Sequence, residues 1–246
     1  MPPKTIFITG TDTGVGKTLM TALLLAHLRS NGCHALAIKP FCSGGTADIE
    51  ILHALQDGEL TREEISPFYF REPLAPLVAA RKDHRSITLP QVLQRINQVL
   101  RALHSTLDPR PSALLIEGSG GLLVPLGKGY TVLDLILKLD CEVVVVSRNR
   151  LGTINHTLMT VQALQNARIK TKTQLTDTQK LRVVLMNDLP ANHSTPGTRS
   201  NPGILAELLA PIPVHPIPFL GENPSRLRAI REAAKKMKKP LAQILR

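Results

Sequence analysis

The sequence has no tryptophan, few other aromatic residues and only three cysteines. Its five Phe and two Tyr, in 246 residues, are too few to build the stacking platforms on which single-stranded nucleic acids bind. Cys33, Cys42 and Cys141 are odd in number and include no CxxC pair. A disulfide framework and a zinc ribbon are therefore excluded, and this cysteine usage suits a reducing cytoplasm.

Long hydrophobic runs are also missing. No apolar stretch reaches the roughly 18 residues of a membrane-spanning helix. The apolar stretch near the N-terminus ends at a glycine loop and is too short for a signal peptide. Glycine and proline, at 16 and 19 residues, are too sparse and too aperiodic for a fibrous or disordered protein. We expect a cytoplasmic protein without a membrane span.

The composition that is present, 43% hydrophobic and 20% charged, is typical of a globular protein, and we predict one domain over residues 1–246. Short β-branched runs alternate with helical patterns along the chain. These runs are continuously apolar, which indicates strands buried on both faces. The pattern predicts an α/β fold, with a mostly parallel sheet and helices on both faces.

The predicted strands are 5–9, 35–39, 113–116, 141–147, 181–186 and 214–220. The last of these is interrupted by proline and is therefore placed at an edge of the sheet. The predicted helices are 17–30, 48–55, 89–107, 153–167, 204–209, 225–237 and 241–245. Two polar segments, 170–180 and 191–202, are expected to be loops.

Positive charge is concentrated in two segments. The net charge is +11, and residues 226–246 hold eight Lys or Arg against one acidic residue, Glu232. A second basic cluster spans 168–182. The favoured interpretation is a solvated helical face, in which case we expect removal of the residues after 226 to leave activity intact. The alternative is a patch that binds nucleic acid or an anionic membrane.

A glycine-rich loop carries the strongest chemical signal. Residues 10–18 read GTDTGVGKT, follow a predicted strand and open a predicted helix, which is the context of a phosphate-binding loop. Its backbone N–H groups can surround phosphate oxygens, Lys17 can reach the β- and γ-phosphates, and the Thr18 hydroxyl can ligate Mg²⁺. The strict pattern has glycine at position 11, where this chain has Thr11, so the loop is a variant. We predict a P-loop NTPase-like nucleotide site.

Polar residues follow two further strands, at the sheet edge where ligands of open α/β sheets bind. Lys39 ends the second predicted strand and Ser43 follows it, and Glu117 ends another. Thr18, Asp48 and Glu117 are the predicted oxygen ligands of Mg²⁺, and Lys17 and Lys39 would neutralise a phosphoryl group in transfer. Each has a simpler interpretation: Asp48 as a helix N-cap, Lys39 as a solvated strand end.

Several motifs in one order resemble the dethiobiotin synthetase family. They are the 10–18 loop, Lys39-Pro40 with Ser43-Gly44, Glu117-Gly118-Ser119-Gly120-Gly121, LGTINHTL at 151–158, Asn187-Asp188 and Glu222-Asn223-Pro224. The resemblance spans roughly residues 5–224 and implies one reaction. An amine of 7,8-diaminononanoate takes up CO₂ as a carbamate, ATP phosphorylates the carbamate, and the second amine closes the ring of dethiobiotin and releases phosphate.

The resemblance also implies residue roles. Lys39, Lys17 and Ser43 would be catalytic, with Lys39 and Ser43 on the carbamate, and Thr18, Asp48 and Glu117 would hold Mg²⁺. Asn187 would contact the adenine edge. The residues assigned to ATP are Thr13, Gly14, Val15, Gly16, Lys17, Thr18, Asn187, Glu222, Asn223 and Pro224.

A homodimer with sites at the subunit interface is implied in the same way. The substrate carboxylate would bind at residues contributed by the partner chain, namely Gly152, Thr153, Ile154 and Asn155. The residues themselves agree, because a glycine turn that opens a helix offers free N–H groups to an anion. The simpler interpretation of the turn is helix initiation alone.

Three alternatives remain. A partition or cell-division ATPase of the ParA/MinD kind would bind DNA or membrane through the basic surface, although such proteins have a second lysine at the position of Thr11. An amide-forming relative would need an appended glutaminase domain, for which the chain is too short. A pure binding module would leave Lys39, Asp48 and Glu117 without a role.

Overall fold

A six-stranded parallel sheet forms the centre of the computed structural model, which describes residues 2–105, 109–171 and 180–246. The strand order is β10-β9-β8-β1-β5-β2, and every neighbouring pair is parallel. The strands are β1 (Lys4–Gly10), β2 (His34–Ile38), β5 (Ser112–Glu117), β8 (Glu142–Arg148), β9 (Leu181–Met186) and β10 (Val214–Ile217). The predicted parallel sheet is confirmed, with β10 at its edge.

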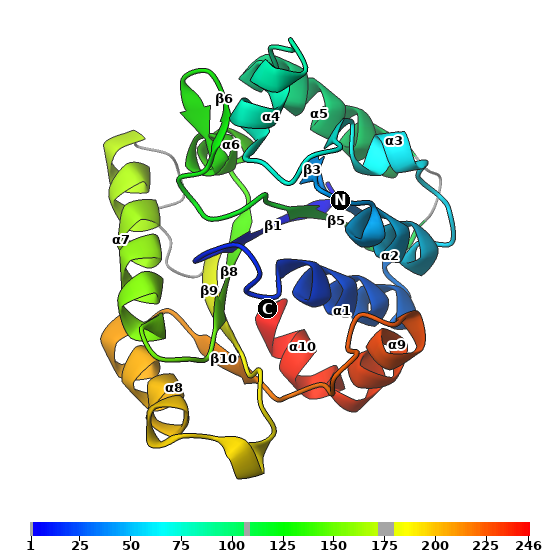
Figure 1. The fold of residues 1–246 in the computed structure, drawn as a ribbon. Helices are drawn as coiled ribbons and strands as arrows, with labels where there is room; N and C mark the ends of the chain where they lie inside the picture. Colours follow the sequence, from blue (N-terminus) through cyan, green and yellow to red (C-terminus); the bar gives the residue numbers. More distant parts are fainter. Residues whose placement is uncertain (1, 106–108, 172–179) are drawn as a thin grey trace.

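Helices cover both faces of this sheet (Figure 1). One face carries α1 (Lys17–Ser30), α9 (Leu227–Lys236) and α10 (Lys238–Ile244). The other carries α5 (Leu89–Ser105), α6 (Val132–Leu139), α7 (Thr153–Thr171) and α8 (Pro196–Leu209). Within the described ranges, no helix combines the length and the apolar character needed to cross a membrane.

Shorter elements lie beyond the ends of β2 and β5. Strand β3 (Phe41–Ser43) pairs in parallel with β4 (Phe68–Phe70), and β6 (Pro125–Gly127) pairs antiparallel with β7 (Tyr130–Thr131). The helices of this part are α2 (Ala47–Leu55), α3 (Arg62–Ile65) and α4 (Pro76–Lys82). Because β3 and α2 follow β2 directly, they place the residues after Lys39 above the carboxyl end of the sheet.

The expectation of a loop over 191–202 is wrong for most of that segment. A short 3₁₀ turn covers Ala191–His193, and α8 already begins at Pro196. Thr195 and Thr198 form a reciprocal capping pair at its start, and proline is tolerated in the first helical turn. The other expected loop, 170–180, lies mostly outside the described residues.

The basic C-terminal segment is amphipathic. Its apolar residues Ile230, Ala234 and Leu241 are buried, and α9 and α10 pack on α1. The Lys and Arg side chains therefore form the solvated face of two packed helices, as the favoured interpretation had it. Removing everything after 226 would expose the α1 face of the core, so the condition on which activity was expected to stay intact, a tail that is only a solvated face, is not met.

Candidate active site

The glycine loop connects the end of β1 to the start of α1. Gly14 and Gly16 have φ angles of 72° and 101°, a left-handed conformation that glycine adopts without strain. A Cβ on Gly16 would also lie 3.3 Å from Met186 Cγ. The loop therefore needs glycine at position 16 for its backbone turn and for its contact with β9.

Lys17 lies buried at the first turn of α1. Its Nζ donates to the backbone oxygen of Asp12 at 2.8 Å, across the loop. Burial lowers the pKa of Lys17 to about 8, a shift that nearby Glu117 opposes and Lys39 reinforces. The ammonium is therefore poorly solvated by water in the free protein, and a phosphate anion in the loop would stabilise its charged form.

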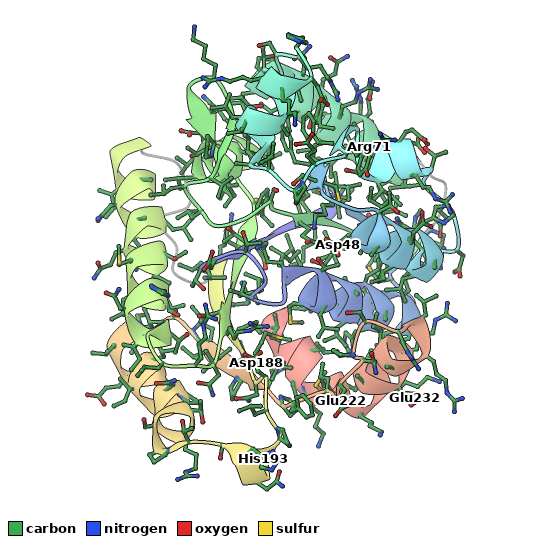
Figure 2. All side chains as sticks on the ribbon, in the orientation of Figure 1. Asp48, Arg71, Asp188, His193, Glu222 and Glu232 are labelled. Atoms are coloured by element: carbon green, nitrogen blue, oxygen red, sulfur yellow. The ribbon has the colours of Figure 1, made fainter. Side chains whose placement is uncertain are left out.

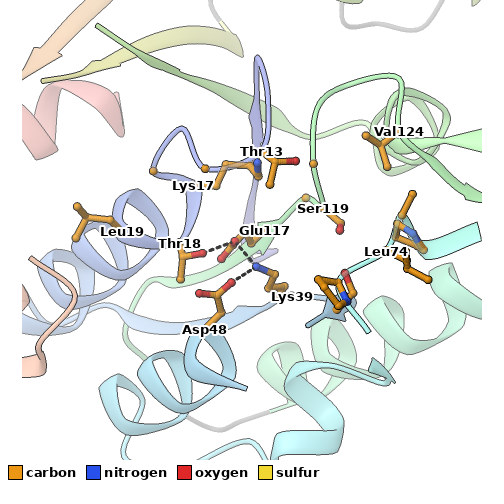
Figure 3. A pocket seen from close by; sticks show the side chains of 18 of the residues that line it. Thr13, Lys17, Thr18, Leu19, Lys39, Asp48, Leu74, Glu117, Ser119 and Val124 are labelled. Carbon is orange, nitrogen blue, oxygen red and sulfur yellow. Dashed lines mark hydrogen bonds and ion pairs between the residues drawn. The ribbon is translucent and has the colours of Figure 1, made fainter. Parts of the chain in front are cut away.

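Lys39, Asp48 and Glu117 form an ion-paired cluster beside the loop (Figure 3). Lys39 Nζ lies 2.8 Å from Glu117 Oε1 and also pairs with Asp48 Oδ2. The Thr18 hydroxyl donates to the same Glu117 oxygen at 2.7 Å. Four side chains from α1, β5, α2 and the end of β2 thus converge on one point. Asp48 is not the N-cap of α2, since Thr46 occupies that position.

The electrostatics of this cluster favour a charged lysine. Burial would lower the pKa of Lys39, but the Glu117 and Asp48 carboxylates more than offset it and raise the pKa above its ordinary value. Glu117 is only 1% exposed, and its Oε2 has no hydrogen-bond partner among the described residues. A buried carboxylate oxygen with a free lone pair is suited to a cation.

A cavity of about 600 Å³ opens over this cluster. Ser43, at the end of β3, lines it together with Ser119 and Ser225. Of the predicted residues, the cavity brings together Thr13, Gly14, Gly16, Lys17, Thr18, Lys39, Ser43, Asp48 and Glu117. Its far wall is the segment from Pro73 to Pro76, which has no motif and was not predicted.

A second cavity, of about 630 Å³, shares Gly14, Gly16 and Leu19 with the first and lies on the β9 side of the loop. Val15, Asn187, Glu222 and Pro224 line it, together with Asp188 and His193; Asn223 does not. Three of these lining residues, Asp188, His193 and Glu222, are labelled in Figure 2, together with Asp48 of the first cavity. We call the first space the phosphate-side cavity and the second the base-side cavity.

The start of α7 lies apart from both cavities. The residues that line them include none of Gly152, Thr153, Ile154 and Asn155. Thr153 is buried, and its hydroxyl is hydrogen-bonded to Ser147 Oγ at 2.7 Å. Leu151, next to the turn, is 97% exposed, and Met159 on the same helix is 60% exposed. Within one protomer, the α7 turn and the loop therefore do not form a common site.

Sequence reasoning missed the polar groups around Asn187. Arg148 pairs with Asp188 (2.8 Å) at the wall of the base-side cavity. Asn149 and Asn201 lie beneath this cavity. Asn201 donates a hydrogen bond to Asn149, and Asn149 donates one to Asn187. The only signal in the sequence was the position of Arg148 and Asn149 directly after a strand, because Asn201 joins them through the fold from a segment predicted to be a loop.

The parallel sheet and the glycine loop between β1 and α1 define a P-loop NTPase-like protein. The chain matches the family described as "AAA domain" over residues 4–216. The cell-division protein complex MinC:MinD of Aquifex aeolicus is similar in structure, with a TM-score of 0.53, 12% identity, and coverage of 98% of this chain and 95% of that one. At this identity the likeness shows the fold alone.

Curated relatives are more similar in sequence. An ATP-dependent dethiobiotin synthetase BioD of Anaeromyxobacter sp. is 44% identical over 164 residues, which cover 65% of this chain and 70% of that protein. The enzyme of the same name from Methanocaldococcus jannaschii is 36% identical over 167 residues, covering 68% and 76%. The chain belongs to the ATP-dependent dethiobiotin synthetase family, and the resemblance predicted from its motifs is confirmed.

Proposed function

We propose that this protein, working as one domain over residues 1–246, converts 7,8-diaminononanoate, CO₂ and ATP into dethiobiotin, ADP and phosphate. One amine and CO₂ form a carbamate; a carbamate oxygen attacks the γ-phosphorus of ATP, giving a carbamic–phosphoric anhydride and ADP. The second amine then attacks the carbonyl carbon, and phosphate leaves. The observation that carries this proposal is the convergence of Lys17, Thr18, Lys39 and Glu117 beside a phosphate loop in a chain of this family.

The side chains support these steps through charge. Lys17 lies where it would bind the β- and γ-phosphate oxygens, and Lys39 where it would neutralise the charge that grows on the transferring group. Ser43, on the same cavity wall, would donate a hydrogen bond to the carbamate. Because Lys39 acts mainly in the transition state, Lys39→Ala should lower turnover more than ATP affinity.

Mg²⁺ fits the residues present. Thr18, Asp48 and Glu117 offer a hydroxyl and two carboxylates, and Glu117 has a buried oxygen without a hydrogen-bond partner in the described part of the chain. Among the described residues no group of three or more His, Cys, Asp and Glu side chains could hold a metal alone. This is typical of Mg²⁺ sites that share their cation with nucleotide phosphates, where the ion polarises the phosphoryl oxygens.

The base-side cavity is the proposed nucleoside site. Asn187 carries a carbonyl oxygen and an amide N–H at the cavity wall, a pair that matches the N6 and N7 edge of adenine. Glu222 and Pro224 lie on the opposite loop. The two cavities meet at Gly14 and Gly16, so a single ATP would lie across the glycine loop with its phosphates on one side and its base on the other.

A second copy of the chain would complete the substrate site. The turn at Gly152 to Asn155 lies outside both cavities of its own protomer, and exposed Leu151, before α7, and Met159, on α7, suit an interface between copies. Mixing Lys17→Ala protein with a protein substituted at Asn155 should restore part of the turnover that each lacks. If the mixture shows no more activity than the sum of the two variants measured alone, a site shared between two copies is contradicted.

The decisive experiment follows one reaction by mass spectrometry. Purified protein is incubated with diaminononanoate, ATP, Mg²⁺ and ¹³C-bicarbonate. A labelled product heavier than the substrate by CO₂ less water, with one phosphate released per product, is expected. ATP hydrolysis without this product, stimulated by DNA or lipid vesicles, would instead favour a partition ATPase that uses the basic face of α9 and α10.

A further inference from the structure

A chain of three asparagine side chains runs beneath the base-side cavity. Asn201 Nδ2 donates to Asn149 Oδ1 at 2.8 Å, and Asn149 Nδ2 donates to Asn187 Oδ1 at 2.7 Å. Asn149 and Asn201 are 5% and 6% exposed. Of the three residues, only Asn187 lines the cavity. Asn149 follows β8, Asn187 follows β9, and Asn201 lies in α8, so the chain joins the end of the sheet to a surface helix.

Backbone carbonyls fix the direction of every bond in this chain. Asn187 Nδ2 donates to the oxygen of Ile217 at 2.8 Å, and Asn149 Nδ2 also donates to the oxygen of Thr198 at 2.8 Å. Asn201 Nδ2 lies 3.4 Å from the oxygen of Arg150. A carbonyl oxygen accepts and never donates, so no one of the three amides can turn over without placing oxygen against oxygen.

The amide of Asn187 is therefore held in one orientation. Its backbone N–H also donates to Ile217 at 3.1 Å, which ties the residue to the end of β10 twice. After these bonds Asn187 keeps one N–H and one lone pair of Oδ1. A donor beside an acceptor complements adenine, which presents an amino group beside N7; guanine presents two acceptors at the same edge.

We propose that Asn149 and Asn201 are positioning residues that make the nucleotide site selective for the 6-amino group of adenine, by fixing the Oδ1 of Asn187 toward it. The inference rests on the proposed role of Asn187 at the base. Buried amides that are fully hydrogen-bonded resist rotation, and a bidentate asparagine held in this way discriminates against the wrong base by roughly 10- to 100-fold.

The test compares two nucleotides that differ only in the 6-amino group: ATP and purine riboside 5′-triphosphate. Their dissociation constants are measured by calorimetry on the full-length protein, for the wild type, Asn149→Ala and Asn201→Ala. The wild type should prefer ATP by at least tenfold. Asn149→Ala should reduce that preference at least fivefold, mainly by weakening ATP, because Asn187 Oδ1 then loses its donor and the amide is held by the Ile217 carbonyl alone.

Asn201→Ala should have the same effect but a smaller one, since Asn149 still donates to Asn187. Asn97→Ala, at an exposed position on α5, is the matched control and should keep the wild-type preference. A loss of folded protein lowers binding of both nucleotides equally and leaves their ratio unchanged. If Asn149→Ala does not fold, the ratio for Asn201→Ala decides alone.

Three failures are distinguishable. A wild type that binds neither nucleotide would overturn the proposed ATP site itself. A wild type that prefers ATP, together with variants that keep the preference within twofold, would overturn only the role of Asn149 and Asn201. A wild type that binds both nucleotides equally would overturn the fixed orientation of Asn187 while leaving nucleotide binding in place.

Discussion

Removing the charge of Lys39 is the sharpest test of the cluster at the sheet edge. In Lys39→Met the buried Glu117 carboxylate, whose side chain is 0% exposed, loses its cation, while Asp48, at 37%, can still be reached by water. Breaking a buried ion pair by removing one partner costs about 3–5 kcal/mol, because the remaining charge stays desolvated. We expect the free energy of unfolding of the metal-free protein to fall by about that amount.

Urea denaturation followed by circular dichroism measures this change. Lys39→Met combined with Glu117→Gln should recover most of the loss, since the uncompensated charge is then gone. Lys82→Met, which breaks the exposed ion pair with Glu72, is the matched control and should cost about 1 kcal/mol or less. Stability of Lys39→Met equal to wild type, or no recovery in the double variant, would refute the electrostatic reasoning.

The other predictions concern the loop and the basic face. Gly16→Ala forces a side chain onto a φ of 101° and against Met186, so ATP affinity should fall at least about tenfold by calorimetry, whereas Gly203→Ala, where a Cβ has open space, should leave it unchanged. Nucleotide phosphates should raise the pKa of Lys17 from about 8, so ATP affinity should be level below pH 8 and fall above it. Calorimetry in two buffers should then show roughly one proton taken up per ATP at pH 9. No proton uptake at pH 9 would contradict the lowered pKa of the buried Lys17 ammonium. Four exposed lysines of the basic face can be replaced by glutamine together, namely Lys235, Lys236, Lys238 and Lys239. The replacement should change neither turnover nor the unfolding midpoint. A large loss of turnover would give the basic face a role in the reaction.

Most of the sheet was predictable because its strands are short, continuously apolar and bounded by turns. The predicted boundaries differ from the observed ones by one residue in β1, β2, β5 and β8, and the strand predicted at 214–220 ends earlier, at Ile217. Helix α6 escaped prediction although it has a clear start signal, the reciprocal cap between Thr131 and Asp134. Its eight residues read VLDLILKL, a mostly apolar run too short to separate helix from strand by periodicity.

The residues of the candidate site also differ in whether the sequence could predict them. Lys17 could be predicted from the glycine loop after β1. Lys39 and Glu117 could be predicted because one follows β2 and the other ends β5, and the fold brings the carboxyl ends of parallel strands together. Asn201 could not, because it lies 52 positions from Asn149 and reaches it only through the packing of α8. The expectation for Asn223 rested on the family motif Glu222-Asn223-Pro224, and side chains in a loop do not all face one cavity.

The contact between Gly16 and Met186 has a consequence for the length of the bound molecule. Met186 supports the loop that would hold the phosphates, and the next residue, Asn187, faces the base. The end of one strand, β9, would thus position both the phosphate-binding loop and the residue that contacts the base, which fixes the distance between the two ends of a bound nucleotide. A chain of phosphates one unit shorter or longer would place its last phosphorus away from Lys39 even when its base is correctly seated.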